Sequence, residues 1–302
     1  MIEDGLAVFL LAVALDIMFG EPPARIHPVV WIGKLIAFLR NHARPTRFHG
    51  IIIALIVILA TVLTGHLLVS LTAPVPFLSL LIAAFLFKST FAIRCLLRVS
   101  ADIGGMIDQD INEAKKMLPA LVGRDASSLM HTQAASAVIE SLSENYVDSI
   151  LSPLFYYVLF ESCGLGLEAA LAFKAVSTMD SMIGYKTREL KELGCAGARL
   201  DDLANFIPAR LSIVFMALAR PAKAAAVLRA AFKYHSATPS PNSGWPMAAC
   251  AGVLGIRLEK VGHYVLLEEG KDPETADISK AVRFMQITIA LTLAASVLAL
   301  FF

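Results

Sequence analysis

The chain has 302 residues, of which 57% are hydrophobic and only 17% are charged. Soluble domains carry about 25% charged residues on average, so this composition, with a mean hydropathy of +0.68, excludes an ordinary soluble protein and indicates a polytopic membrane protein. The net charge of +1 provides no bulk attraction to a polyanion, which argues against nucleic acid as a partner.

Apolar runs along the chain predict where it crosses the membrane. The first run is preceded by Glu3 and Asp4 instead of a basic segment, and no small-residue cleavage site follows it. We therefore expect a retained helix and not a signal peptide. A crossing takes ~20 apolar residues. The four runs that we expect to cross are 6–19, 51–71, 77–97 and 285–302.

The distribution of Lys and Arg predicts the orientation. With four crossings, both chain ends and the 72–76 link lie outside and contain no Lys or Arg, whereas the 21–50 loop and the 98–284 region contain many. Basic residues accumulate on the cytoplasmic side of membrane proteins. We therefore expect a single membrane domain, 1–302, in the cytoplasmic membrane, with a catalytic region at 98–284 that faces the cytosol.

Two weaker apolar segments, 150–173 and 206–219, are expected to be re-entrant or interfacial. The first is interrupted at Glu161–Gly166, and the second is short and contains Arg210. Counting both as crossings would place a group of basic residues outside, against the charge rule. Broken helices at membrane depth are tolerated where they line a cavity, so these segments fit a site better than a simple crossing.

The rest of the pattern is mostly helical. No internal repeat stands out, which weakens a transporter built from inverted repeats. The fold class is therefore all-α: a polytopic helical integral membrane protein with re-entrant or interfacial helices and a large cytosolic helical region. Pro, Asn and Gly predict a loop at 239–246. Further helices are expected near 108–120, 126–148, 187–194, 220–235 and 273–283.

The first polar motif is ESLSENYVD at 140–148. Glu140, Glu144 and Asp148 are each four residues apart, so a helix would stack three carboxylates on one face. Such like charges repel unless a divalent cation or a cationic partner neutralises them. The alternative is a solvated acidic face, which the apolar residues that surround the motif disfavour. Asn145 lies beside these acids as a candidate substrate ligand.

The second motif surrounds Asp180 and Gly184. Gly184 permits a close backbone approach, and Lys174 and Lys186 are candidates to meet phosphate as point charges. Tyr185 is a further candidate substrate ligand. A helix cap followed by a basic turn would give a similar pattern, so this motif alone is a weak signal.

The third motif, RLDDLANFIPAR at 199–210, combines hard oxygen donors with cations. On a helix Asp201 and Asn205 would share a face. Mg²⁺ is usually held by one or two carboxylates plus substrate phosphates, which makes Asp201 and Asp202 candidate ligands together with Glu144 and Asp148. Arg199 and Arg210 are candidates to bind phosphate. The alternative is a helix cap with an arginine that reaches the membrane surface.

Two further polar stretches complete the candidates. His235, Asn242 and Trp245 belong to a Pro-, Ser- and Gly-rich stretch that offers an imidazole, small donors and an aromatic face for a substrate; an ordinary surface loop is the alternative. Near the start, Asp16 and a Pro-bounded turn lie at the membrane end of the first apolar run, where helix-end punctuation explains them equally well.

Several familiar patterns are missing. The four cysteines form no C-x-x-C pair, which argues against a disulfide framework or a zinc site and fits reduced thiols. No P-loop, G-x-G-x-x-G or G-x-S-x-G pattern is present. If the protein uses ATP, a standard Walker site does not bind it.

Taken together, these stretches resemble the CbiB/CobD family of cobalamin biosynthesis membrane proteins, the adenosylcobinamide-phosphate synthases. The resemblance runs from about residue 15 to about residue 264, in family order, and several of its motifs are long. The matching stretches are LDIMFGEPP, HPVVWIGK, LVGRD at 121–125, ESLSENYVDSILSPLF at 140–155, FKAVSTMDSMIGYK at 173–186, ARLDDLANFIPARL at 198–211 and SPNSGWPMAACAGVLGIRL at 240–258.

The resemblance implies an ATP-dependent ligase. Its expected reaction joins adenosylcobyric acid to (R)-1-amino-2-propanol O-2-phosphate, or a related amino-alcohol phosphate, and gives adenosylcobinamide phosphate. ATP and Mg²⁺ are the expected cofactors. The expected partners are the corrinoid and amino-alcohol phosphate substrates, membrane lipid and other membrane enzymes of cobalamin assembly. The acids assigned to metal binding or catalysis are Glu140, Glu144, Asp148, Asp180, Asp201 and Asp202.

Two other function classes stay open at this point. Aspartate-rich helices that hold Mg²⁺-diphosphate also serve intramembrane prenyl transfer, which would need a prenyl diphosphate and no ATP. A corrinoid-binding or transport protein without chemistry would line a path open to both sides with its polar groups. The basic residues on one side only, and the missing repeat, disfavour transport.

Overall fold

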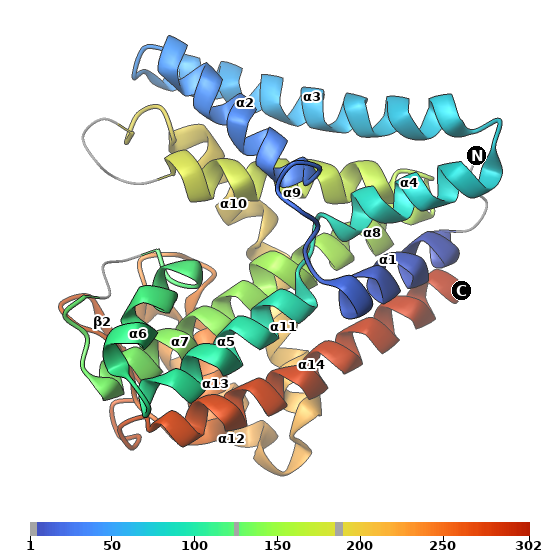
Figure 1. The fold of residues 1–302 in the computed structure, drawn as a ribbon. Helices are drawn as coiled ribbons and strands as arrows, with labels where there is room; N and C mark the ends of the chain where they lie inside the picture. Colours follow the sequence, from blue (N-terminus) through green and yellow to red (C-terminus); the bar gives the residue numbers. More distant parts are fainter. Residues whose placement is uncertain (1–4, 124–126, 185–189) are drawn as a thin grey trace. The chain divides into compact units, whose positions relative to one another are not determined.

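The computed structural model describes residues 5–123, 127–184 and 190–302. Within these ranges the secondary structure is helical apart from one short hairpin, which confirms the expected all-α class. The chain forms two units (Figure 1). Unit 1 comprises Met1–Ala92, Ser152–Ala204 and Ala295–Phe302, and unit 2 comprises Ile93–Leu151 and Asn205–Ala294.

The helices of unit 1 come from two separate parts of the chain. In Figure 1, α2 and α3 lie side by side, and α9 lies against both of them. The helices are α1 (Gly5–Phe19), α2 (Pro28–His42), α3 (Arg47–Thr72), α4 (Pro76–Lys88), α8 (Ser152–Glu161), α9 (Gly166–Ile183) and α10 (Cys195–Ala204).

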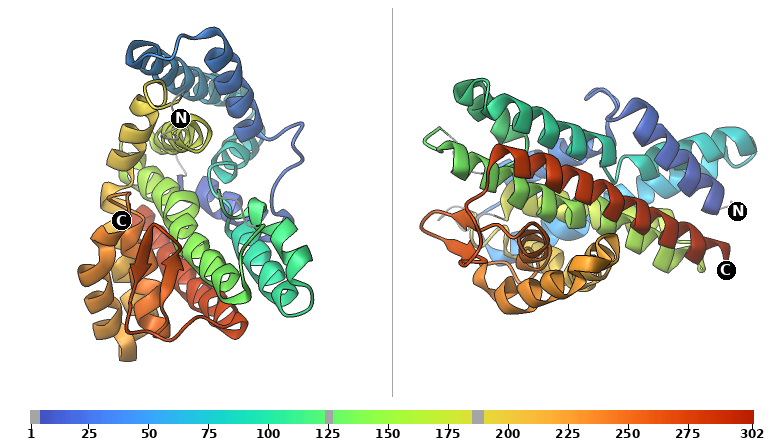
Figure 2. Two further views of the ribbon diagram at one scale, coloured as in Figure 1. Left: turned by 90° about the vertical axis from the view of Figure 1, so that its left-hand side faces the viewer. Right: turned by 90° about the horizontal axis from the view of Figure 1, so that it is seen from below.

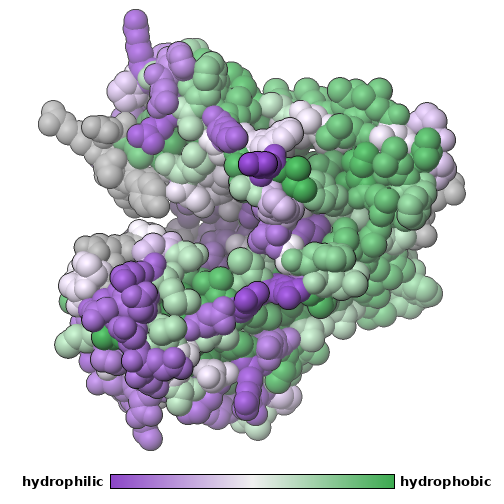
Figure 3. Space-filling model, viewed as in Figure 1, coloured by the Kyte–Doolittle hydropathy of each residue, from purple (hydrophilic) through white to green (hydrophobic). Residues whose placement is uncertain are grey.

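Helix α3 illustrates how the sequence forms these elements. The Thr46 side chain accepts a hydrogen bond from the backbone N–H of His49 at 3.4 Å and so caps the first turn. The helix has 26 residues, and its segment from Ile51 to Ala60 contains no polar side chain. Every fourth residue from Ile51 to Leu67 is exposed, and hydrophobic residues gather over α3 in Figure 3. This apolar stripe suits contact with lipid.

Two clusters form the core of unit 1. One is aliphatic and joins α2, α3 and α9 through residues such as Ile36, Val57 and Met179. The other is aromatic: the rings of Phe87 in α4 and Tyr157 in α8 stack with their centroids 3.9 Å apart. The Tyr157 hydroxyl also donates to the carbonyl of residue 5 at 2.9 Å, which fixes α8 against the start of α1.

Unit 2 contains the remaining helices and the hairpin. Figure 2 shows α12 lying alongside α13, and α13 also packs against α7 and α11. The elements are α5 (Ile93–Ile107), α6 (Ile111–Met117), α7 (His131–Tyr146), α11 (Phe206–Ala219), α12 (Ala224–Tyr234), α13 (Gly244–Leu254), β1 (Leu258–Lys260), β2 (Tyr264–Leu266) and α14 (Thr275–Phe301), whose last residues belong to unit 1.

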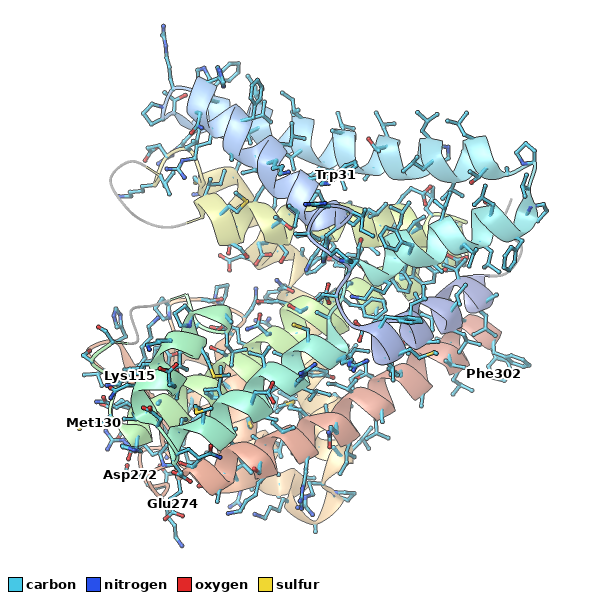
Figure 4. The ribbon with its side chains drawn as sticks, viewed as in Figure 1. Trp31, Lys115, Met130, Asp272, Glu274 and Phe302 are labelled. Carbon is cyan, nitrogen blue, oxygen red and sulfur yellow. The ribbon has the colours of Figure 1, made fainter. Side chains whose placement is uncertain are left out.

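Small residues allow α12 and α13 to approach closely. A Cβ at Gly252 would lie 2.6 Å from the Ala226 carbonyl oxygen, so only glycine fits there. The antiparallel hairpin after α13 pairs Leu258 with Leu266, and both side chains are fully buried. Charged residues gather at the hairpin and α6 end of unit 2, where Figure 4 labels Lys115, Asp272 and Glu274.

The helix boundaries differ from the sequence expectation at several points. The hairpin was not expected at all. The helix expected near 126–148 begins at 131 and gives way to a π-helical turn at Val147–Leu151. In place of the helix expected at 187–194, residues 190–194 form turns and α10 begins at 195; residues 187–189 lie outside the described part. The runs at 273–283 and 285–302 form one helix, α14.

Among the described residues, four helical runs are long and apolar enough to cross a membrane: Arg47–Thr72, Pro76–Ile107, Cys195–Ala219 and Thr275–Phe301. Three of them contain the runs expected at 51–71, 77–97 and 285–302. The fourth differs, because the short apolar run at 206–219 is preceded directly by α10 and the two together reach 25 residues. Helix α1 has 15 residues, fewer than the ~20 that a crossing takes.

Candidate functional site

Unit 2 brings three of the predicted substrate ligands together around a fourth, Arg210 of α11. The guanidinium lies 3.5 Å from the centre of the Phe206 ring and 5.1 Å from that of Trp245. Its Nη1 donates to the Phe206 carbonyl at 2.7 Å and to Asn242 Oδ1 at 3.3 Å. The His235 ring stacks on Trp245 at 3.9 Å with 7° between the planes. We call these five residues the Arg210 cluster.

The segment between α12 and α13 holds the cluster in place. The Ser240 hydroxyl accepts hydrogen bonds from the backbone N–H groups of Asn242 and Ser243, at 3.2 and 3.4 Å. The Thr238 hydroxyl donates to the carbonyl of the same serine at 3.0 Å. A Cβ at Gly244 would lie 2.0 Å from the carbonyl oxygen of His235, so the tight return of the chain requires glycine. The sequence correctly predicted a loop here, although α13 begins at 244.

Two side chains of the cluster have N–H groups that donate to no acceptor in the described part of the chain. The Trp245 side chain is only 6% exposed, and its Nε1–H has no partner. Arg210 uses only Nη1, and it forms no ion pair with any described residue. A buried donor without an acceptor is costly, and a cation held by rings and neutral oxygens keeps its charge uncompensated. The arrangement therefore suits a ligand that only accepts hydrogen bonds.

Glu140 of α7 is buried, and its carboxylate is fully hydrogen-bonded. It is 4% exposed, and each of its oxygens accepts a hydrogen bond from a hydroxyl: Oε1 from Ser136 at 2.6 Å and Oε2 from Tyr264 of β2 at 2.9 Å. The Ser136 hydroxyl in turn accepts from the Glu259 backbone N–H of β1 at 2.8 Å. Glu140 thus joins the hairpin to α7 through these hydrogen bonds.

The π-helical turn changes the geometry of the other two acids in this motif. Glu144 lies in α7, whereas Asp148 lies within the turn Val147–Leu151, so the expected α-helical stack of three carboxylates does not form. Both are half-buried. Asn145 donates from Nδ2 to the Ser141 carbonyl at 2.9 Å. π-Turns within α-helices are rare and frequent at functional sites, and this one packs against α11, the helix of Arg210.

Unit 1 brings the other predicted acids together on α9 and α10. Burial and the neighbouring charge of Asp202 raise the pKa of the Asp180 carboxyl. Asp201, on the same turn of α10, interacts electrostatically with Tyr156 of α8. A Cβ at Gly184 would lie 2.0 Å from Asp180 Oδ1, so the glycine makes room for this carboxylate. A carboxyl with a raised pKa beside a second acid is typical of catalytic acids and bases.

The remaining predicted ligands are more scattered. Lys174 is half-buried in α9, and Arg199 is exposed on α10. Asn205 is 1% exposed at the start of α11, where its side chain makes no cap hydrogen bond. Asn205 stands between α10 and α11 with an α-helical backbone conformation, so the face that it was expected to share with Asp201 stays a prediction. Tyr185 and Lys186 lie outside the described residues.

One charged group escaped the sequence prediction. Lys88 of α4 is 3% exposed in its side chain and lies 3.1 Å from Asp16 Oδ1 and 2.8 Å from Glu21 Oε1. His27 Nε2 lies 2.8 Å from the other oxygen of Glu21. The signal was present in the sequence, because a lysine within an apolar run calls for an opposite charge. The motif around residues 16–27 therefore supplies the counterions of a buried lysine.

A cavity of about 460 Å³ lies within unit 1 among α3, α8, α9 and α10. Its walls are mostly apolar and include Tyr156, Phe173 and Leu200. The only acid in its lining, among the described residues, is Glu168, which pairs with His66 Nδ1 at 2.8 Å. The cavity therefore suits an apolar group and not an ion.

No group of three His, Cys, Asp or Glu side chains in 5–123, 127–184 and 190–302 lies close enough together to hold a metal ion. The four acids predicted as metal ligands also belong to different units: Glu144 and Asp148 to unit 2, and Asp201 and Asp202 to unit 1. Within either unit, the described residues thus form no cage of three or more such protein ligands.

Comparison with known proteins gives one family. The family described as CobD/Cbib protein matches residues 9–293. A relative from Methanothrix thermoacetophila, named probable cobalamin biosynthesis protein CobD, is 53% identical over 286 residues, which cover 91% of this chain and 90% of that protein. Relatives of the same name from Methanothermobacter thermautotrophicus and Thermococcus kodakarensis are 40% and 38% identical, and each alignment covers more than nine-tenths of both proteins. No solved structure matches the chain.

Proposed function

Because this chain belongs to the CobD/Cbib family, and so takes part in cobalamin biosynthesis, we propose that it is adenosylcobinamide-phosphate synthase. In this reaction the enzyme joins the propionate of adenosylcobyric acid to the amine of (R)-1-amino-2-propanol O-2-phosphate, or a related amino-alcohol phosphate. The match over residues 9–293 is the observation that carries the proposal. The Arg210 cluster in unit 2 and the acids Asp180, Asp201 and Asp202 in unit 1 supply the kinds of group that the chemistry needs.

The propionate carboxylate must be activated, since a carboxylate does not condense with an ammonium ion in water. We propose that the propionate attacks the γ-phosphorus of ATP, which gives an acyl phosphate and ADP. The amine then attacks the acyl carbon and expels inorganic phosphate, which leaves the amide. The ammonium ion must lose a proton before its attack, so a general base must lie nearby.

Asp180 is the best candidate for that base. Its pKa is raised by burial and by Asp202, and a base works best when its pKa lies near the working pH. Gly184 leaves space for its carboxylate. Glu140 is a poor candidate, because both of its oxygens already accept hydrogen bonds from Ser136 and Tyr264.

The predicted acids suit Mg²⁺ only when a nucleotide supplies the remaining ligands. Mg²⁺ is commonly held by one or two carboxylates and completed by substrate phosphates. Asp201 and Asp202 provide hard oxygen donors in unit 1, and Glu144 and Asp148 do so in unit 2. Mg²⁺ would neutralise the charge that develops on the transferred phosphoryl group. Lys174, Lys186 and Arg199 are the proposed cations for the phosphates of ATP.

We also propose that the protein lies in the cytoplasmic membrane with its polar clusters on the cytosolic side. ATP is available there, and the excess of Lys and Arg in the loops 21–50 and 98–284 favours that side. Other membrane enzymes of cobalamin assembly are proposed neighbours of the protein.

An assay on purified, detergent-solubilised protein tests the reaction. It contains adenosylcobyric acid, aminopropanol phosphate and Mg·ATP, and mass spectrometry follows the corrinoid. We expect a product joined by one amide, dependent on ATP and on Mg²⁺. Tight corrinoid binding without product would instead indicate a binding or transport role, and product formed from a prenyl diphosphate without ATP would indicate prenyl transfer. Full activity of Glu144→Ala or Asp201→Ala would refute the roles given to those acids.

A further inference from the structure

We propose that the Arg210 cluster binds the phosphate monoester of the amine substrate and not the phosphates of ATP. This inference rests on the proposed function, because it assigns one part of one substrate to one group of residues. It concerns Arg210, Trp245 and their immediate neighbours within unit 2.

The charge of the cluster is the first argument. Arg210 is half-buried, its Nη1 is held by two neutral oxygens, and Nε and Nη2 donate to no described residue. Its flat faces contact aromatic rings, at 3.5 Å from the Phe206 centroid and 5.1 Å from that of Trp245. A guanidinium fixed in this way presents two parallel N–H groups to one anion, which is the geometry that phosphate accepts.

The buried indole N–H of Trp245 is a second and independent observation. Its indole N–H is a donor that cannot accept, its side chain is 94% buried, as 6% is exposed, and no described group accepts from it. Buried donors of this kind need a partner. The guanidinium lies over the indole ring, 5.1 Å from its centroid, so an anion bound by Arg210 would lie close to Trp245.

The lack of a carboxylate bonded to Arg210 in the described part of the chain indicates which of the two phosphate-bearing substrates, ATP or the amino-alcohol phosphate, suits the cluster. In the described part of the chain, Arg210 donates hydrogen bonds to a carbonyl and an amide oxygen and lies over two aromatic rings, and it forms no ion pair with a carboxylate. ATP arrives with Mg²⁺, which takes one or two carboxylates from a protein. A phosphate monoester needs no metal, so a cluster of cations and neutral donors suits the amine substrate better.

The cluster is also rigid enough to position a small ligand. The Ser240 hydroxyl fixes the backbone before Asn242, and Gly244 brings the chain back against the His235 carbonyl. A phosphate anchored here would hold the amine of a short amino alcohol at a constant distance from the guanidinium. Fixing the reacting amine in this way lowers the entropic part of the barrier.

The chain contains a built-in reporter for the test. It has two tryptophans, Trp31 and Trp245. Trp31 is 60% exposed in unit 1, and its indole donates to the Arg25 carbonyl at 3.0 Å. In the variant Trp31→Phe, all tryptophan emission comes from the cluster. Titration with aminopropanol phosphate, without corrinoid or ATP, is expected to change that emission saturably.

The ligand series discriminates between the sources of phosphate. Inorganic phosphate is expected to compete with aminopropanol phosphate, and 1-amino-2-propanol without its phosphate is expected to have no effect. Mg·ATP is expected neither to change the emission nor to compete. A response to Mg·ATP but not to the monoester would overturn the assignment, and so would the lack of any response to the monoester.

Two variants on the Trp31→Phe background localise the binding. Arg210→Gln is expected to raise the Kd for aminopropanol phosphate by about 10- to 100-fold, because a hydrogen bond to a charged group is lost. Arg220→Gln, at the exposed end of the same helix, removes an equal charge as a control and is expected to change Kd by less than about twofold. Equal effects of the two variants would refute a specific site.

Steady-state kinetics separates this inference from the proposed reaction. Arg210→Lys keeps the charge but loses the fork of two donors, and it is expected to raise KM for the amino-alcohol phosphate while KM for ATP stays unchanged. If the wild type forms product but Arg210→Lys does not raise KM for the amino-alcohol phosphate selectively, the assignment of the cluster is refuted and the proposed synthase activity is not. If Trp245 responds to the monoester and no amide forms, the anion site stands and the synthase fails.

Discussion

Lys88 in unit 1 and Arg210 in unit 2 are both basic residues within apolar helices, and their surroundings differ sharply. Lys88 lies within 3.1 Å of two carboxylates, those of Asp16 and Glu21. Arg210 has no carboxylate partner among the described residues and is held by aromatic rings and neutral oxygens. A buried cation that is already neutralised serves the fold, whereas one that is left uncompensated is available to a ligand.

Replacing Lys88 by Met tests the first half of this comparison and has the largest expected effect. The change leaves the carboxylates of Asp16 and Glu21 without their ammonium, so we expect unfolding to become easier by about 3–5 kcal/mol. The measurement is the midpoint of thermal unfolding in detergent. Arg210→Met is the matched control and is expected to change stability by less than about 1 kcal/mol, although it impairs binding of the phosphate substrate. A reversal of these two results would refute the comparison.

The pair of Lys88 and Asp16 can also be tested by a double-mutant cycle. If the two charges neutralise each other, Asp16→Asn should recover part of the stability that Lys88→Met removes. We expect a coupling energy of up to about 3 kcal/mol, in the range found for residues in one ion-pair network. Additive effects within about 0.5 kcal/mol would mean that the two residues act independently.

Two acids, Glu140 and Asp180, differ in the same way as the two basic residues. Glu140 accepts two hydroxyl hydrogen bonds, and Asp180 lies beside the like charge of Asp202. Removing the Tyr264 hydroxyl by Tyr264→Phe leaves Glu140 with one hydroxyl donor fewer and is expected to cost about 1–3 kcal/mol of stability. Chemical denaturation would measure the loss, and kcat of the folded fraction should stay near that of the wild type. A large fall in kcat without loss of stability would make Glu140 catalytic.

Much of the fold could be predicted from the sequence. Apolar runs define the long helices, because a membrane crossing requires a continuous and mostly apolar segment. The Arg210 cluster was also predictable in part, since Arg210, His235, Asn242 and Trp245 all stood out as polar or aromatic residues in motifs. Their convergence around one guanidinium depends on how α11 packs against α13, and local sequence does not determine that packing.

Other features could not be predicted, for identifiable physical reasons. The π-helical turn at 147–151 adds a residue to one turn of a helix, and no local residue pattern marks it, so the stack of Glu140, Glu144 and Asp148 was expected in error. The hydrogen bond from Tyr264 to Glu140 joins residues 124 apart in the chain, so local sequence could not show it, and a catalytic role for Glu140 stays a prediction. The hairpin has strands of three residues, too short to show a two-residue period.

The role of Asp180 predicts a pH dependence. Burial and the charge of Asp202 both disfavour the ionised form of Asp180, so they raise its pKa. If Asp180 is the base for the ammonium ion, it must be ionised, and kcat falls as the pH decreases through that raised pKa. Asp202→Asn removes the like charge and lowers the pKa of Asp180, so the acid limb of the pH–rate profile should move to lower pH. Asp202→Glu keeps the charge and should leave the limb nearly in place. An unmoved limb in Asp202→Asn would assign the titration to another group, because Asp180 is the acid whose ionisation that charge opposes.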